Sequence, residues 1–321
     1  MSSLAACAAL TGCGVVGGAS ATHTPTPTET PTSTPTATVT PPPTPTATST
    51  ATPLPTDTPA PAVSLELAQG RTLTVRTPKG SANGATLIFR GRQYPMATDG
   101  DTFWLPVGVG FEVAPGEYPL TINLLDPGGA LLIAINETVT VDSTNFPVEY
   151  LTVPTSGPNG LQPPDQVQKE LDIRARVYAQ FSPLKLWNGP FILPVTGPVS
   201  TEFGTARSYN GGPISEHHSG TDFAVDEGTP IKAAADGRVA FTGMLTTRGN
   251  SVMIDHGLGV FTAYHHLSRI DVTEGQMVKQ GDIIGAAGMT GLATGPHLHW
   301  ELIVGGENVD PVYWTFAGVA P

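Results

Sequence analysis

The sequence predicts a mainly β protein: an antiparallel, glycine-rich β-sheet domain preceded by a small β-sandwich domain, one linker helix and a disordered Thr/Pro stalk. Short runs in which apolar and polar residues alternate recur from residue 63 onward, separated by glycine and proline turns, as is typical of strands. A single stretch, 165–182, repeats its apolar residues at helical spacing. A length of 321 residues leaves room for about two domains.

Composition and charge exclude several classes of function. The chain has 15 Lys and Arg against 27 Asp and Glu, a net charge of −12. Proteins that bind nucleic acid neutralise phosphates with basic side chains, so we expect no nucleic-acid partner. No apolar run reaches the ~18–20 residues of a membrane-spanning helix. Both cysteines, Cys7 and Cys13, precede the predicted domains, which therefore hold neither a disulfide nor a Cys-based zinc finger.

Residues 1–20 are small and weakly apolar, which is typical of a targeting segment. Leu10-Thr11-Gly12-Cys13 resembles the lipobox of bacterial lipoproteins, which implies a lipoprotein-type leader and a lipid anchor at Cys13. Leu4-Ala5-Ala6-Cys7 is a competing match. The segment lacks the basic residues and the longer apolar core of such leaders, since the first Lys or Arg is Arg71. A disordered leader with incidental cysteines is therefore the alternative.

Residues 21–62 repeat Thr-Pro and Thr-Pro-Thr and carry two charged residues, Glu29 and Asp57. Proline removes backbone donors and the segment has almost nothing to bury, so we expect a disordered, extended stalk. At ~3.1 Å per residue, about forty residues reach on the order of 120 Å. Such a stalk could hold a domain well away from a membrane.

Residues 63–153 alternate apolar and polar residues over short runs such as Thr72-Leu-Thr-Val-Arg76, with turn signals such as Pro115-Gly116 between them. This spacing predicts an immunoglobulin-like β domain. It holds no cluster of His, Cys or paired carboxylates, so we interpret it as a spacer or targeting module, and an adhesive role for it is an alternative.

The linker, residues 154–188, contains the predicted helix at 165–182. Asp165 is the expected N-cap after two prolines, and Val167, Leu171, Tyr178 and Phe181 recur at helical spacing. We expect this apolar stripe to pack the helix against one of the two neighbouring domains.

From Gly189 short strands return with tight glycine turns, which predicts an antiparallel β domain at 189–321, large enough for one core. Six of the eight histidines lie in or beside three short stretches of it, 218–222, 264–267 and 295–301. Imidazole nitrogens and a carboxylate are ligands that zinc prefers, with one position left for water. The sequence therefore predicts one metal site from these stretches.

Local spacing supports this site. A strand places alternate residues on one face, so His297 and His299 can both face the site while Leu298 points into the core. His218 and Asp222 lie four apart, but Gly220 and the β-branched Thr221 favour a loop entering a strand over a helix.

These stretches resemble the lysostaphin/LytM-like zinc metallopeptidases, which are bacterial cell-wall endopeptidases. The resemblance spans roughly residues 189–316, in order and at similar spacing. The matching segments are 194–204 (PVTGPVSTEFG), 218–224 (HSGTDFA) with 228–237 (GTPIKAAADG), 264–267 (YHHL), and 275–281 (GQMVKQG) running on to 294–302 (TGPHLHWEL).

The resemblance implies that His218, Asp222 and His299 bind Zn²⁺ and leave the fourth position for water. It implies that His266 and His297 assist catalysis without binding the metal. One would take a proton from the attacking water, and the other would stabilise the oxyanion or protonate the leaving amine. The residues do not say which does which.

The implied function is hydrolysis of peptide bonds in peptidoglycan stem peptides or cross-bridges, by a monomer exported to the cell envelope or cell surface. The alternative is a non-enzymatic wall-binding protein, or an activator of a separate amidase. Family members of that kind typically lose several site residues, and this chain keeps all five. We expect residues 205–216 and 242–250 to wall the substrate groove.

Four other residues of this domain receive weaker predictions. Alternation predicts that His217 and His265 point away from the site. His256 lies in a predicted hairpin turn and is expected to be structural or solvated. Glu301 shares a strand face with His299 and is either an acid of the site or a partner that orients an imidazole.

Overall fold

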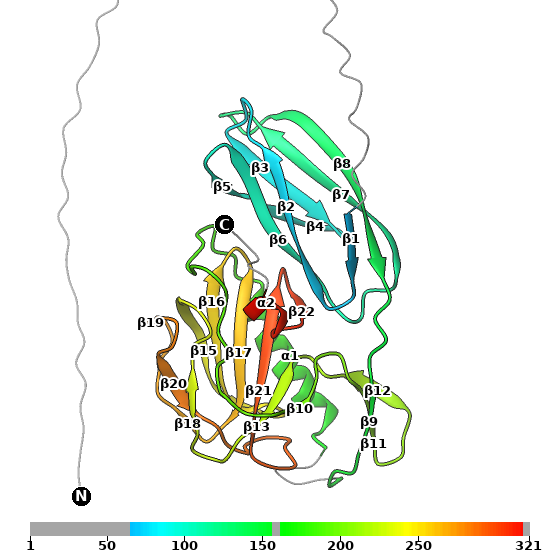
Figure 1. Ribbon diagram of the computed structural model, residues 1–321, viewed down its shortest axis with the longest axis vertical. Helices are drawn as coiled ribbons and strands as arrows, with labels where there is room; N and C mark the ends of the chain where they lie inside the picture. The colour runs from blue at the N-terminus through cyan, green and yellow to red at the C-terminus, as the bar shows by residue number, and fades with distance from the viewer. Residues whose placement is uncertain (1–64, 156–160, 317–321) are drawn as a thin grey trace, which may run out of the picture. The chain divides into compact units, whose positions relative to one another are not determined.

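A computed structural model describes residues 65–155 and 161–316 of the chain (Figure 1). Strands dominate these residues, which contain two helices, so the predicted mainly β fold is confirmed. The leader, the stalk and the two cysteines lie outside the described residues. Within the described ranges, no helix is long and apolar enough to cross a membrane.

The first eight strands form two sheets that bury a shared apolar core. Their orders are β1-β8-β7-β3-β4 and β2-β6-β5, antiparallel except for the parallel pair β1–β8. Alternation places every second residue inside, so Leu87 of β3 and Leu120 of β7 are fully buried. The bounds are Leu65–Ala68 (β1), Arg71–Pro78 (β2), Gly84–Phe89 (β3), Arg92–Pro95 (β4), Ala97–Asp99 (β5), Thr102–Val109 (β6), Gly116–Leu125 (β7) and Leu131–Asp142 (β8).

The ninth strand, β9 (Val148–Leu151), pairs with neither of these sheets. It lies parallel to β11 (Ala206–Tyr209), which pairs antiparallel with β12 (Ile214–His217). A segment that precedes the predicted linker thus joins a hairpin from the C-terminal domain. This pairing carries β9 to the candidate site.

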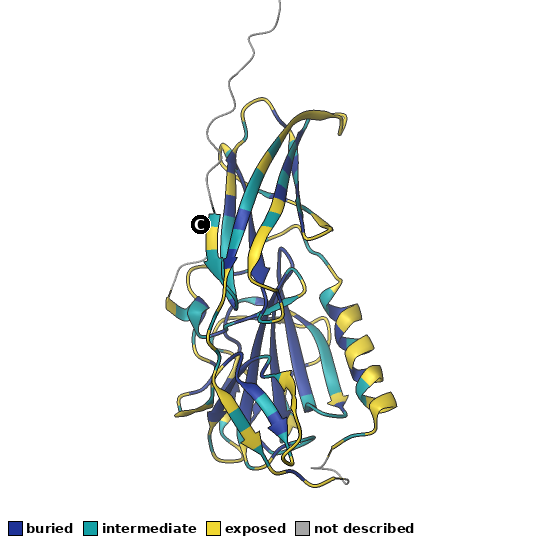
Figure 2. Cartoon of the chain, turned by 90° about the vertical axis from the view of Figure 1, so that its right-hand side faces the viewer, coloured by how far each residue is buried: buried dark blue, intermediate teal, exposed yellow. Residues whose placement is uncertain are grey.

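Helix α1 (Pro164–Tyr178) begins close to the predicted start and ends four residues before the predicted end. Pro164 stands where a helical N–H would be unpaired anyway, and Asp165 lies in the first turn without capping it. The predicted apolar stripe is wrong at Leu171, which is 44% exposed. The buried residues of the helix are Glu170, Arg174 and Val177, and Figure 2 shows the contrast between its buried and exposed faces.

Strands from residues 199–309 form an eight-stranded antiparallel sheet, the large sheet, of order β10-β13-β21-β17-β16-β15-β19 with β22 paired to β21. Its bounds are Val199–Thr201 (β10), Thr221–Ala224 (β13), His297–Val304 (β21), Val260–Leu267 (β17), Gly249–Gly257 (β16), Gly237–Leu245 (β15), Met277–Val278 (β19) and Glu307–Val309 (β22). A smaller sheet joins β14 (Pro230–Lys232), β20 (Ile283–Ala286) and β18 (Arg269–Ile270). The short helix α2 covers Tyr313–Phe316.

The large sheet is tightly packed where the site lies. Strands β17 and β21 are buried almost throughout, and Tyr264, Leu298 and Trp300 are fully buried in the core. Asp222 on β13 is the register partner of His299 on β21. Two candidate ligands therefore stand side by side on paired strands.

Candidate metal centre

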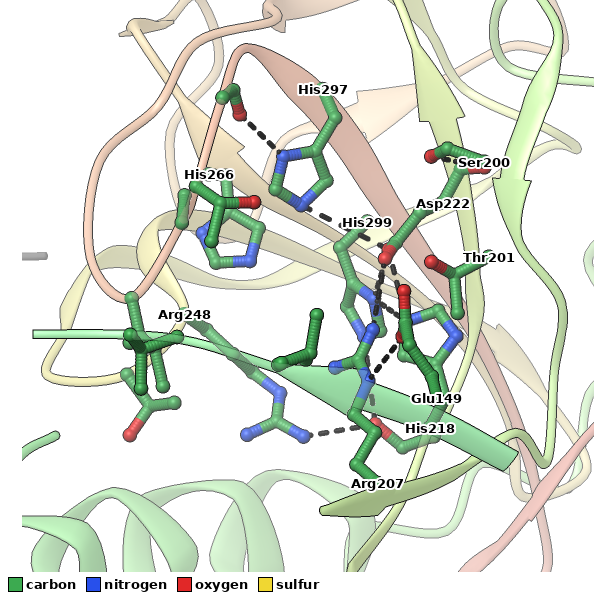
Figure 3. A pocket seen from close by; sticks show the side chains of 18 of the residues that line it. Glu149, Ser200, Thr201, Arg207, His218, Asp222, Arg248, His266, His297 and His299 are labelled. Atoms are coloured by element: carbon green, nitrogen blue, oxygen red, sulfur yellow. Dashed lines mark hydrogen bonds and ion pairs between the residues drawn. The ribbon is translucent and has the colours of Figure 1, made fainter. Parts of the chain in front are cut away.

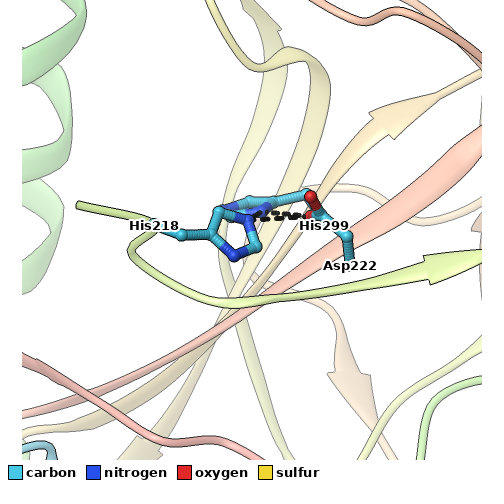
Figure 4. A group of neighbouring side chains, drawn as sticks. All are labelled: His218, Asp222 and His299. Atoms are coloured by element: carbon cyan, nitrogen blue, oxygen red, sulfur yellow. Dashed lines mark hydrogen bonds and ion pairs between the residues drawn. The ribbon is translucent and has the colours of Figure 1, made fainter. Parts of the chain in front are cut away.

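His218, Asp222 and His299 converge at one point on the large sheet (Figure 4). Nε2 of His218 lies 2.8 Å from Nδ1 of His299 and 3.0 Å from Oδ1 of Asp222. Nδ1 of His299 lies 2.7 Å from the same carboxylate oxygen. All three side chains are buried. His218 comes from the turn before β13, as the glycine and β-branched residue after it predicted.

The outer hydrogen bonds of the two imidazoles fix which nitrogens carry protons. Nδ1 of His218 lies 3.0 Å from the carbonyl oxygen of Glu202, and Nε2 of His299 lies 3.0 Å from Oε1 of Glu301. Carbonyl and carboxylate oxygens only accept, so these outer nitrogens carry protons. When both rings are neutral, as metal ligation requires, the inner nitrogens hold lone pairs.

Two lone pairs and a carboxylate oxygen thus meet without a donor among them. Such an arrangement is unfavourable unless a cation lies between them. Two imidazole nitrogens and one carboxylate are a donor set of catalytic zinc, and the outer hydrogen bonds are those that orient zinc ligands. His218, Asp222 and His299 therefore fit a zinc ion.

Burial and charge set the protonation of this cluster. Burial lowers the pKa of His218 to about 4, so its ring is neutral at pH 7. Burial acts to raise the pKa of the Asp222 carboxyl, but His218 and His299 together hold it well below its usual value. Burial acts to lower the pKa of His299, but Asp222 and Glu301 raise it overall. A proton and a metal cation therefore compete for the inner nitrogen of His299.

His266 and His297 lie beside the cluster (Figure 3). Their ring centroids are 4.6 Å apart. Nδ1 of His266 lies 2.7 Å from the carbonyl oxygen of Thr290, and Nδ1 of His297 lies 2.8 Å from that of Gly295. Each ring therefore donates from Nδ1 and keeps a lone pair on Nε2. Burial holds the pKa of His266 well below its usual value, so this ring is neutral.

A cleft of about 340 Å³ opens over these five residues. As predicted, its walls include both expected segments, through Arg207 and Tyr209 from the first and Arg248 from the second. The sequence did not predict the contribution of β9. Glu149 and Leu151 of β9 line the cleft, whereas Tyr150 between them is 78% exposed on the other face.

Arg207 holds the side of Asp222 that faces away from the histidines. Its guanidinium lies 3.2 Å from Oδ2 of Asp222 and 3.4 Å from Oε2 of Glu149 (Figure 3). Burial acts to lower the pKa of Arg207, but the neighbouring acids raise it overall, so the charge is retained. With Oδ2 engaged, Oδ1 is left for the two imidazoles.

The remaining predicted histidines behave differently from one another. His217 lies at the rim of the cleft and stacks on Phe111 with ring centroids 5.3 Å apart, outside the cluster. The prediction for His265 is wrong: it is the register partner of His299, and their rings stack at 5.5 Å. The cause is the left-handed backbone of His266, with φ of 59°, which breaks the strand alternation.

His256 is structural, in agreement with one of its two expectations. It lies in β16 and is fully buried. Nδ1 lies 2.7 Å from the carbonyl oxygen of Asp236, and Nε2 lies 2.8 Å from Oγ1 of Thr262. Burial lowers the pKa of His256 to about 4, which keeps it neutral.

Glu301 is the residue that sequence reasoning left undecided between two roles. It is fully buried and accepts from His299, so it orients that imidazole. It is held in turn by Arg174 and Arg248, and Arg248 is itself bound by Glu170; sequence reasoning missed all three residues. Glu170 and Arg174 lie four positions apart on α1, but no local spacing links them to Arg248 or Glu301, which lie on other parts of the fold.

Comparison with known proteins finds relatives that share this part of the chain. Residues 216–311 match the model of peptidase family M23. The DD-carboxypeptidase/endopeptidase Mpg of Neisseria meningitidis is 48% identical over 95 residues, 30% of this chain and 22% of that protein. The peptidoglycan DD-endopeptidase ShyA of Vibrio cholerae is 50% identical over 115 residues, 35% of this chain and 26% of that protein.

This chain thus spans only about a quarter of the length of these curated relatives. Among solved structures, a candidate peptidase M23 from Pseudomonas aeruginosa superposes with a TM-score of 0.59 at 29% identity. That likeness covers 79% of this chain and 96% of the other.

Proposed function

Because residues 216–311 form a peptidase family M23 domain, we propose that this protein is a zinc-dependent endopeptidase of peptidoglycan, acting on peptide bonds in stem peptides or cross-bridges. The observation that carries the proposal is the meeting of two imidazole lone pairs and one carboxylate oxygen within 3.0 Å of one another beneath an open cleft. The names of the relatives support the substrate class.

His218, Asp222 and His299 would hold the metal. Bound there, zinc would supply Lewis-acid chemistry, lowering the pKa of a water and polarising the scissile carbonyl. The protein's own contribution is to keep both inner nitrogens unprotonated, through Glu202 and Glu301, and to turn one carboxylate oxygen inward through Arg207.

His266 and His297 would move the protons of the reaction. Hydrolysis adds water to the carbonyl carbon, breaks the C–N bond and requires one proton to pass from the water to the leaving nitrogen. Each ring offers an Nε2 lone pair beside the cluster, so one can accept that proton and the other can donate to the developing oxyanion or the amine once protonated.

We assign the other parts of the chain as apparatus that delivers this domain. Residues 63–153 would be a spacer or targeting module, 154–188 the linker with its helix, and 21–62 an extended stalk. An exported monomer in the cell envelope or at its surface, with a lipid anchor at Cys13, is the arrangement that these segments favour.

Release of soluble fragments from purified sacculi tests the proposal. The full chain is incubated with zinc beside its His297→Ala variant, and mass spectrometry identifies the new ends. We expect fragments with new amino groups from the wild-type protein and at least a hundredfold fewer from the variant. Sacculus binding without release by either protein would instead support a wall-binding protein or an amidase activator. Equal release by both would overturn the role of His297.

A further inference from the structure

Helix α1 brings an acid and a base into the interior of the C-terminal domain. Glu170 is 2% exposed and Arg174 is 8% exposed, although the outer face of the helix is freely solvated (Figure 2). Charged side chains are almost never buried to this degree unless they are paired. Their partners lie on the large sheet and on the turn between β15 and β16.

The buried charges form an alternating chain of acids and bases. Arg248 donates from Nη1 to Oε1 of Glu170 at 2.9 Å and from Nε to Oε1 of Glu301 at 2.9 Å. Arg174 donates to Oε2 of Glu301 at 2.5 Å. Glu170 also accepts the backbone N–H of Thr247 at 2.6 Å. Two acids and two bases thus neutralise one another away from water.

This series of buried charges ends at His299, a candidate metal ligand. Oε1 of Glu301 accepts from Nε2 of His299 at 3.0 Å and from Oγ of Ser219 at 2.7 Å. Arg248 donates to the same Ser219 hydroxyl at 3.0 Å. With donors on both of its oxygens, the Glu301 carboxylate can rotate only by breaking charge-assisted bonds.

We propose that Glu170 and Arg174 of helix α1 are positioning residues for the metal centre, acting on His299 through Arg248 and Glu301. By fixing the Glu301 carboxylate, they keep the His299 proton on Nε2 and turn its Nδ1 lone pair toward His218 and Asp222. Both residues lie outside the segment that matches the peptidase family, residues 216–311. The inference rests on the proposed function only in taking His299 to be a zinc ligand.

A consequence concerns the boundary of the catalytic unit. A fragment that begins after α1 would leave Arg248 with one acid in place of two and Glu301 with one base in place of two. Buried charges that lose a partner are strongly destabilising. The helix therefore belongs to the working catalytic unit and is more than a connection between domains.

The test compares three substitutions on one helix of the full chain. Arg174→Met removes the charge at similar length, and Arg174→Lys keeps the charge without the guanidinium fork. The control, Arg176→Met, removes an exposed arginine two positions further along the same helix. The readouts are zinc affinity by chelator competition and ¹⁵N shifts of the His299 ring in zinc-free protein, which report the tautomer directly.

We expect Arg174→Met to lower zinc affinity about ten- to hundredfold and to mix the His299 tautomers, with Arg174→Lys in between. Arg176→Met should stay within about twofold of wild type. If Arg174→Met does not fold, Glu170→Gln gives the same test, because it weakens the Arg248 arm while keeping the shape of the side chain.

Loss of thermal stability with unchanged His299 tautomer and unchanged zinc affinity would overturn the proposal and leave α1 a packing element. The tautomer is measured without metal, so this result does not depend on whether the protein hydrolyses peptidoglycan. Absence of zinc binding by the wild-type protein would count against the proposed function instead.

Discussion

His266 and His297 face each other beside the metal centre with ring centroids 4.6 Å apart, and each points Nδ1 at a backbone carbonyl. The Nε2 of His297 lies 3.9 Å from Oδ1 of Asp222, beyond hydrogen-bond distance. Neither ring is therefore tied to the ligand cluster. In the proposed mechanism both rings accept and return protons, which would distinguish them chemically from His218 and His299.

Replacing either of these histidines should separate catalysis from metal binding. His266→Ala and His297→Ala are each expected to lower kcat by about 10²–10⁴, because each removes one proton-transfer group. Zinc content, measured by metal analysis, should remain at the wild-type level. A variant that keeps full activity, or one that loses its zinc, would show that the residue has a different role.

Metal removal should inactivate and destabilise the protein together. A strong chelator is expected to abolish hydrolysis and lower the melting temperature, because zinc held at a thousand times its Kd contributes about 4 kcal/mol. His218→Ala should behave like the chelated protein. His217→Ala, one residue away but stacked on Phe111, is the control and should retain zinc. Equal melting temperatures with and without zinc would contradict a bound metal at this site.

Arg207 should affect zinc affinity through Asp222. Arg207→Met frees Oδ2 of the carboxylate, and we expect zinc affinity to fall about ten- to hundredfold. Arg238→Met removes another arginine that pairs with a buried aspartate, Asp255, away from the cleft. That control should leave the affinity unchanged in the same chelator competition, and a similar loss in both variants would indicate a general effect of charge.

The wall formed by β9 should contribute to substrate binding. Leu151→Ala removes apolar surface that lines the cleft. We expect KM to rise about tenfold with kcat little changed, since a substrate that covers about two of the three removed carbons loses about 1.6 kcal/mol at ~0.8 kcal/mol each. Tyr150→Ala, on the opposite face of the same strand, should leave both parameters unchanged. Steady-state kinetics on a soluble cross-linked peptide would measure both parameters. Equal effects from the two variants would show that β9 does not contribute to substrate binding.

The stability of the fold should depend on pH through His256. Burial lowers its pKa to about 4, whereas an unfolded histidine titrates near 6.5. The folded protein binds fewer protons in this interval, so the stabilisation is complete above about pH 6.5 and is lost as the pH falls toward 4. The full loss is on the order of 3 kcal/mol.

Urea unfolding of zinc-free protein at pH 7 and pH 4.5 measures this loss. His256→Gln keeps a polar side chain but cannot be protonated, so its free energy of unfolding should fall less between the two pH values. Other buried histidines, such as His218, remain in both proteins and cancel in the comparison. An identical fall in both proteins would show that His256 does not contribute.

The sequence predicted those parts of the site that depend on local spacing. Alternation along one strand places His297 and His299 at the site, and the residues after His218 indicated a loop entering a strand. Alternation failed at His265 because the positive φ of His266 carries no signal in the residue type. The mainly β fold followed from the same periodicity and is confirmed.

What could not be predicted depends on pairing between distant elements. Arg174 and Glu301 are 127 positions apart, and neither position shows a pattern that links it to the other. The helix was expected to bury apolar residues, yet it buries Glu170 and Arg174 and exposes Leu171. Similarly, nothing in the composition of β9 indicates that it pairs with β11.

Anomalous diffraction at the zinc edge, from crystals of the zinc-loaded full chain, tests the metal centre most directly. The account predicts one strong peak bounded by Nε2 of His218, Oδ1 of Asp222 and Nδ1 of His299, at about 2.0–2.2 Å from each atom. His266 and His297 should lie outside coordination distance. A peak bound by either of these two histidines in place of a predicted ligand, or no peak in the cleft of a zinc-soaked crystal, would contradict it.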